Sequence, residues 1–346
     1  MNALNRLLAT CALTLAPVTE AFAGDVLEGA LMSGSERLLA WSLLDPRLPA
    51  VAKSASEKIL TKSGYGVAPG VTKSDFRIRP FLRYDGNLNG GMPGDSLSIG
   101  PFTFMIPEDY QAVSGALVGV SAEAIHVQAL GNGLSMDLHG GISLGVSPET
   151  GLQKHQAVAE GCLRQMVSAD FFVHGCLTAG WQKWDLGESV QVSARAGATH
   201  LFSMGKTRNQ ITAELRQDYF PSVDGSEKSD QMIGSVELLS ALPDGSAVSV
   251  EVEVGEKSTD RSALRRKISA GYTRKIAGQP TSISLSWQEN EGGMFLGAPR
   301  RDEIISASIK RPVGESMLMT VGVSKTNSTA DILDNLSVDV GFSWKF

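Results

Sequence analysis

The chain ends in the stretch DVGFSWKF, Asp339–Phe346, in which apolar and polar residues alternate without a break. Val340, Phe342 and Trp344 fall on one face of an extended strand, because successive side chains of a strand point to opposite sides. A large aromatic side chain such as Phe346 gains little at a free, solvated chain end. The stretch therefore predicts a last strand whose apolar face lies against an apolar environment.

The same alternation runs through the chain from Asp75 onward. It is clearest in FRIRPFLRY (76–84), LSMDLHGGISLGV (134–146) and VSVEVEV (248–254). The predicted strands have roughly 10–15 residues, whereas strands of soluble sandwiches have about 5–6. They span 75–87, 112–127, 134–146, 153–167, 171–184, 189–203, 206–219, 230–241, 246–257, 262–276, 280–290, 302–312, 315–326 and 335–346.

The connections between these strands alternate in length. Turns such as 204–206 and 277–279 are short, whereas connections on the opposite side, such as 88–111 and 291–301, are mostly longer. This pattern is typical of outer-membrane barrels. We predict an all-β fold over residues 75–346, a transmembrane antiparallel β-barrel of about 14 strands with both termini on the periplasmic, short-turn side.

The segment LSIGPFTFMI (97–106) leaves the strand count open. Its apolar residues fit a loop, an extension of the first hairpin, or additional strands.

The composition agrees with a barrel and excludes other classes. Mean hydropathy is −0.02, midway between a soluble protein and a helical membrane protein. No apolar run approaches the roughly 18 residues that a membrane-spanning helix needs. The net charge of −6 argues against nucleic acid as a partner, because nucleic acid requires a basic surface.

The first 74 residues form three predicted parts. Residues 1–23 read as a signal peptide, with Arg6 before an apolar run and the small-x-small sequence AFA at 21–23. Residues 24–64 read as a periplasmic helical hairpin of two helices, the second beginning at the Asp45–Pro46 cap. Residues 65–74 read as a linker.

The polar faces of the predicted strands carry charges of both signs, which point into the lumen. Glu251 and Glu253 lie on the strand before that of Arg265 and Lys267, so cross-strand ion pairs are expected. This density of charged side chains suggests a braced lumen that is partly filled by its own residues as much as it suggests a selective channel. The predicted lumen-facing charges include Arg77, Arg79, Arg83, Arg164, Arg195, Arg216, Glu214, Asp218, Glu251, Glu253, Arg265 and Lys267.

Cys162 and Cys176 are equidistant from Ala169, the centre of a short predicted turn, and both fall on the polar face. A cross-strand disulfide is therefore geometrically feasible in an oxidising compartment, and two free thiols are the alternative. The sequence holds no HExxH, CxxC or other metal-ligand spacing, so we predict no metal site and no cofactor.

Asp137 and His139 share one lumen face, and His174 lies on the same face of another strand. Barrel enzymes use carboxylate–histidine pairs of this kind, but no serine stands in a nucleophile motif beside them. A solvated lumen pair is the favoured interpretation, and we predict no catalytic residues.

The terminal stretch also resembles the signal that the barrel assembly machinery reads in outer-membrane proteins. That pattern, polar-x-Gly-x-x-aromatic-x-aromatic, corresponds here to Asp339, Gly341, Trp344 and Phe346. The resemblance implies that this machinery is a partner during insertion, with outer-membrane lipid around the finished barrel.

Three stretches resemble the surface lipoprotein assembly modifier (Slam) family: RPFLRYDGNLNGG, PRRDEIISASI, and the closing VSKTNSTADILDNLSVDVGFSWKF. In the first of them, Asn87 and Asn89 correspond to that family's Asn-x-Asn loop. The resemblance covers residues 75–346 and implies a barrel of about 14 strands. The family carries a long domain of helical repeats before the barrel, whereas residues 24–64 here supply only one hairpin.

The resemblance implies transport of lipoproteins or other secreted proteins to the cell surface of a Gram-negative bacterium. The alternative is a passive, porin-like diffusion channel, and the third reading is a barrel enzyme. The client or solute is not specified by the sequence.

Overall fold

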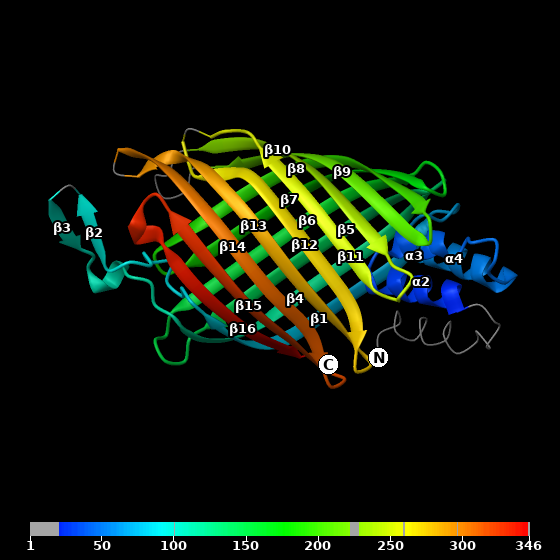
Figure 1. Cartoon of the computed structure of the whole chain (residues 1–346), viewed down its shortest axis with the longest axis horizontal. Helices are drawn as coiled ribbons and strands as arrows, with labels where there is room; N and C mark the ends of the chain where they lie inside the picture. Colours follow the sequence, from blue (N-terminus) through cyan, green and yellow to red (C-terminus); the bar gives the residue numbers. More distant parts are fainter. Residues whose placement is uncertain (1–20, 100, 222–227, 259, 296, 345–346) are drawn as a thin grey trace.

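The computed structural model describes residues 21–99, 101–221, 228–258, 260–295 and 297–344. Within them, fourteen antiparallel strands close into one barrel, with β1 between β4 and β16 (Figure 1). The all-β barrel prediction is therefore confirmed. The barrel strands are β1 (Gly70–Asp85), β4 (Gly115–Gly131), β5 (Leu134–Val146), β6 (Gln153–Met166), β7 (Phe171–Trp184), β8 (Gly187–Met204), β9 (Thr207–Phe220), β10 (Ser229–Ala241), β11 (Ala247–Gly255), β12 (Ala263–Ile276), β13 (Gln279–Phe295), β14 (Ala298–Val313), β15 (Met317–Ser328) and β16 (Asn335–Trp344).

The two faces of the wall follow the alternation in the sequence. Phe76, Ile78 and Leu82 of β1 are exposed on the outside, while Arg77, Arg79 and Arg83 point to the inside. The same order continues in the other strands, with Leu177, Leu215 and similar residues exposed outside. A closed wall with an apolar outside and a polar inside satisfies its backbone internally and is compatible with lipid. The chain is thus an outer-membrane-type β-barrel.

The short turns lie at one end of the barrel and most of the longer loops at the other (Figure 1). Two connections on the long-loop side differ from expectation. Residues 291–301, read as a loop, continue β13 and β14 as one long hairpin, with a register shift between Glu291 and Met294. The β7–β8 connection at 185–186 is only a tight turn.

The open segment 97–106 adds nothing to the barrel. It forms a separate two-stranded sheet, β2 (Ser96–Ile99) and β3 (Phe102–Met105), which projects beyond the long-loop end (Figure 1). The barrel also begins earlier than predicted, because β1 starts at Gly70 inside the supposed linker and pairs with β4 from its first residue.

The helical segment contains three helices where two were predicted: α2 (Ala21–Met32), α3 (Glu36–Ser42) and α4 (Ala50–Lys62). Gly34, at a φ of +75°, and the N-cap Ser35 interrupt the single first helix that the apolar spacing suggested. The predicted Asp45 cap is wrong. Pro49 precedes α4, and Asp45 instead accepts hydrogen bonds from the backbone and side chain of Arg47.

The predicted signal peptide lies outside the described residues except for 21–23, which belong to α2. Among the described helices, each is too short or too polar to cross a membrane.

Candidate functional site: the lumen and its plug

Helices α2, α3 and α4, which we call the plug, occupy the short-turn mouth of the barrel (Figure 1). Leu38 of α3 and Ala30 of α2 are fully buried against the lumen-side residues Leu201, Leu239 and Ala241. Tyr65, which follows α4, packs edge-on against Phe172 with 5.1 Å between ring centroids. These contacts form the main buried apolar cluster of the protein.

The plug reaches the wall from β4 to β12. At one side, Gly64 lies so close to Val127 and Ser135 that a Cβ there would sit 2.6 Å from Ser135. At the other side, Gly29 lies against the β10–β11 turn, and a Cβ added there would sit 2.6 Å from the Ser246 carbonyl oxygen. Larger side chains at either position would displace the plug.

Polar anchors surround the apolar cluster. Ser35 donates to Gln210 at 2.6 Å, and Arg37 donates to Thr199 at 3.2 Å. Arg37 also lies over the Phe172 ring, 5.7 Å from its centroid. Burial lowers the pKa of the Arg37 guanidinium below its usual value.

Asp45 is the strongest ionic anchor of the plug. Its carboxylate, 7% exposed, is paired with both Arg47 and Arg208, and the Arg208 guanidinium lies over Trp41. The hydrogen bonds from Arg47, and then the charge of Arg208, hold the pKa of Asp45 well below its usual range, although burial opposes them. Glu28 and Lys275 form a further, more exposed pair at 3.4 Å.

The lumen face of β9, β11 and β12 carries a continuous chain of ion pairs. Arg216 bridges Asp218 and Glu253 at 3.1 and 3.5 Å, and Lys267 bridges Glu253 and Glu251. The expected cross-strand pairing thus exists between β11 and β12. The chain of ion pairs contains two cations and three carboxylates, so each carboxylate has a cationic partner and one negative charge is left in excess.

The rest of the wall, from β1 and β4 round to β8, is paired as well. It contains the pairs Arg77–Asp75, Arg79–Glu123 at 3.3 Å, Arg83–Asp85 at 3.7 Å, Arg164–Asp137 at 2.6 Å and Arg195–Glu160 at 2.8 Å. Arg265 differs from the other predicted lumen charges. It lies at an irregularity of β12 and binds the Gly255 carbonyl and Glu291 instead of the β11 glutamates.

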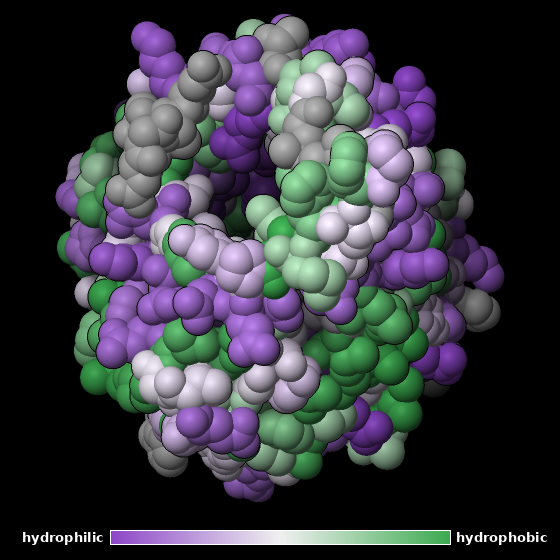
Figure 2. Space-filling view, turned by 90° about the vertical axis from the view of Figure 1, so that its left-hand side faces the viewer, coloured by the Kyte–Doolittle hydropathy of each residue, from purple (hydrophilic) through white to green (hydrophobic). Residues whose placement is uncertain are grey.

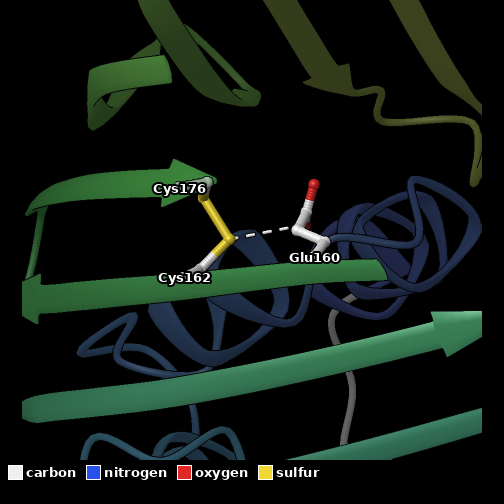
Figure 3. A group of neighbouring side chains, drawn as sticks. All are labelled: Glu160, Cys162 and Cys176. Atoms are coloured by element: carbon white, nitrogen blue, oxygen red, sulfur yellow. Dashed lines mark hydrogen bonds between the residues drawn. A yellow bond between two sulfur atoms is a disulfide. The ribbon is translucent and has the colours of Figure 1, made fainter. Parts of the chain in front are cut away.

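Cys162 and Cys176 face each other across β6 and β7 and are joined by a disulfide (Figure 3). Glu160, two residues before Cys162, brings a carboxylate oxygen to 3.4 Å from its sulfur (Figure 3). The three groups are close enough to resemble a metal site. Because both sulfurs are consumed by the disulfide, they supply no thiolate ligands.

Of the two histidines predicted to face the lumen, His174 has a charged hydrogen-bond partner. His174 is bonded to Glu214 at 2.7 Å, and Asp137 is bonded to Arg164 in place of His139. The hydrogen bonds of the described residues therefore connect neither His139 nor His174 to a serine or threonine hydroxyl.

The lumen is open at the long-loop end, where Figure 2 shows a hollow with a hydrophilic interior. A cavity of about 730 Å³ lies there between Glu188, Phe220, Arg261 and Arg300. A second cavity of about 510 Å³ lines the wall from β1 to β8, with Arg79, Ser143, Gln156 and Gln182 on its surface. The accessible space is thus polar and lies away from the plug.

Of the predicted assembly residues, Asp339, Gly341 and Trp344 lie in β16, opposite Gly322, Thr320 and Met317 of β15. Phe346 lies outside the described residues. The sequence reading missed Arg37, Trp41 and Asp45 as functional positions, because their partners are more than 160 residues away and no local pattern marks them.

Among known proteins, similarity to this chain is found in solved structures of outer-membrane proteins. No family model matches the chain, and no curated protein matches it. Among solved structures, the outer membrane protein OpdK from Pseudomonas aeruginosa has a TM-score of 0.42 at 6% identity, covering 79% of this chain and 99% of its own. A BenF-like porin from Pseudomonas fluorescens Pf-5 has a TM-score of 0.42 at 7% identity, covering 82% and 100%.

Proposed function

We propose that this protein is an outer-membrane channel for small polar solutes, obstructed on its periplasmic side by its own N-terminal helices. The observation that carries this proposal is the asymmetry of the lumen. A polar, hollow interior opens at the long-loop end, while the plug packs into the short-turn mouth. In outer-membrane barrels the short turns are periplasmic, so this proposal assigns the plug and both termini to the periplasmic side.

The paired walls suggest the class of solute. Because most charges of the lumen are matched by an opposite charge within 4 Å, neither cations nor anions meet a uniform field. Small neutral or zwitterionic solutes fit such a lumen better than a highly charged polymer does.

Planar-bilayer recording tests the channel. The full chain should conduct weakly or in rare openings, and a variant lacking residues 24–64 should show steady open steps. Heat-modifiable gel mobility reports whether each barrel is folded. A folded, plug-deleted barrel that does not conduct would rule the channel out.

A second function, export of lipoproteins or other secreted proteins, is favoured by the seam between the first and last strands. β1 pairs with β4 along Gly70–Asp85, but with β16 only over Phe81–Tyr84 among the described residues. A short seam costs less to open than the other interfaces of the wall. A client chain would leave through it or through the lumen.

Cysteine pairs distinguish this second function. Phe81→Cys with Ser343→Cys locks the seam, whereas Ile78→Cys with Ala122→Cys cross-links the extensively paired β1–β4 interface as a control. Surface exposure of a co-expressed lipoprotein should fall only with the first pair, under oxidising conditions. Equal export with both pairs would show that the seam is not the exit.

The barrel assembly machinery is proposed as the partner that inserts the chain. Phe346→Ser should lower the amount of folded protein in the outer membrane more than Leu336→Ser, which changes an exposed residue of β16. Equal losses would indicate a simple effect of exterior polarity.

A further inference from the structure

The β2–β3 hairpin is not explained by a channel. It contributes no strand to the barrel and stands beyond its long-loop end (Figure 1). Phe102, Phe104 and Met105 are 66%, 51% and 69% exposed. Outer residues of the barrel are exposed because lipid surrounds them, but this hairpin lies past the wall, so its apolar side chains need another cover.

The hairpin separates apolar from polar side chains. Leu97 pairs with Phe104, and Phe102 lies two residues from Phe104, so these three apolar residues share one face, whereas Met105 pairs with Ser96 on the other. A lone two-stranded sheet is marginally stable in water, and a third strand or a packing partner is needed to hold it.

Both outer edges of the hairpin lack the usual protection. The strands read SLSI and FTFM, with no charged residue and no proline. Natural edge strands carry lysine, proline or bulges that prevent further pairing. The unprotected edges are therefore suited to strand addition by another chain.

The base of the hairpin is rigid. Asn89, 3% exposed, donates to the Gln111 carbonyl at 2.7 Å and accepts from Val113 at 3.0 Å. Gly90, with a φ of +76°, lies against Trp184, where a Cβ would be 1.9 Å from the ring. Only glycine fits this position, so the chain that leads to the hairpin, which we call the stalk, packs directly against the barrel.

We propose that the β2–β3 hairpin is a docking arm for an extended segment of another protein. The segment would add a strand at a free edge and lay its apolar side chains on Phe102 and Phe104. Three carboxylates next to the hairpin, Asp95, Glu108 and Asp109, favour a segment with basic flanks. The same carboxylates disfavour the anionic headgroups of a lipid surface.

The test uses the full chain in detergent and a fluorescent peptide in which valine and threonine alternate between terminal lysine pairs. Fluorescence anisotropy should report binding, and Phe104→Ser should weaken it by about tenfold or more, as loss of a central aromatic contact does. Met294→Ser is the matched control, because Met294 is 63% exposed at the same end but belongs to β13 of the wall. A peptide interrupted by proline should not bind.

Several results would overturn the docking arm. They are equal binding by the Phe104→Ser and Met294→Ser variants, equal binding of the proline-interrupted peptide, and absence of peptide binding to the unaltered chain. If the unaltered chain binds phosphatidylglycerol vesicles instead of the peptide, and Phe104→Ser abolishes this binding, the hairpin is covered by lipid. A dimer in sedimentation that the substitution dissociates would identify a second copy. None of these readouts depends on conductance, so the channel is judged separately.

Discussion

The two ends of the barrel differ in how their exposed groups are covered. At the short-turn end, the plug buries Leu38 and Ala30 against the wall and neutralises Arg208 with Asp45. At the long-loop end, the lumen opens to solvent and the hairpin leaves Phe102 and Phe104 exposed. The chain therefore covers the short-turn end with its own helices, whereas the exposed apolar groups of the long-loop end are available to other molecules.

The largest expected effect is at the centre of the plug. Leu38→Asp places an unpaired charge in a fully buried apolar cluster, which costs about 3–5 kcal/mol of plug docking. We expect the variant to show long-lived openings in planar bilayers, approaching those of the plug-deleted barrel.

Val51→Asp is the control for Leu38→Asp, because Val51 is 59% exposed on α4 and the same charge there meets water. It should conduct like the unaltered protein. If Leu38→Asp stays closed while its barrel is folded, the plug is not what obstructs the mouth.

The next effect concerns the wall near the plug. Cys162→Ser with Cys176→Ser removes a link that closes a loop of 14 residues, worth at most about 3 kcal/mol. The strands stay paired, so the barrel should unfold at lower denaturant concentration with unchanged conductance. Mass spectrometry of the unreduced wild type should find no free thiol at either cysteine, and two free thiols would contradict the bond.

A smaller effect is expected from the ionic anchor. Asp45→Asn should weaken docking of the plug by about 1–3 kcal/mol, because a buried hydrogen-bonded charge is lost. Its pH dependence follows from the lowered pKa of Asp45. The stabilisation is complete above the usual pKa of a free aspartate and is lost as pH falls through the lower value in the folded protein.

Conductance should therefore be insensitive to Asp45 protonation near neutral pH and rise only in strong acid. In the Asp45→Asn variant this acid-induced rise should be missing or reduced. An equal rise in both proteins would assign the acid response to other carboxylates.

The barrel was predictable from the sequence because lipid and lumen impose opposite polarity on successive residues, as in Phe76 to Arg83. The helix count was not, since Leu27, Leu31 and Leu38 keep a helical spacing across the break at Gly34. The long β13–β14 hairpin was hidden by Gly292 and Gly293, whose positive φ angles serve a bulge within paired strands. Local glycine signals do not distinguish a bulge from the end of a strand.

The plug contacts were harder to predict. Asp45 reads as a helix cap by its neighbour Pro46, but the fold uses its carboxylate for Arg47 and for Arg208, 163 residues away. Arg37 likewise reads as an exposed helical cation in the sequence, but in the fold it contacts Thr199 and Phe172. Such pairings depend on how the closed barrel presents its inner rim, which no local pattern encodes.

The smallest effect should come from removing the β2–β3 hairpin at the long-loop end. Replacing residues 96–105 by a short glycine–serine linker removes the hairpin but keeps the Asn89 stalk. Because the hairpin has no partner strand in the barrel, the free energy of unfolding should change by less than about 0.5 kcal/mol. Conductance should also be unchanged, while peptide binding is lost. A marked fall in barrel stability would instead mean that the hairpin braces the mouth through the packing of β2 against the short helix Asp331–Leu333 of the β15–β16 loop.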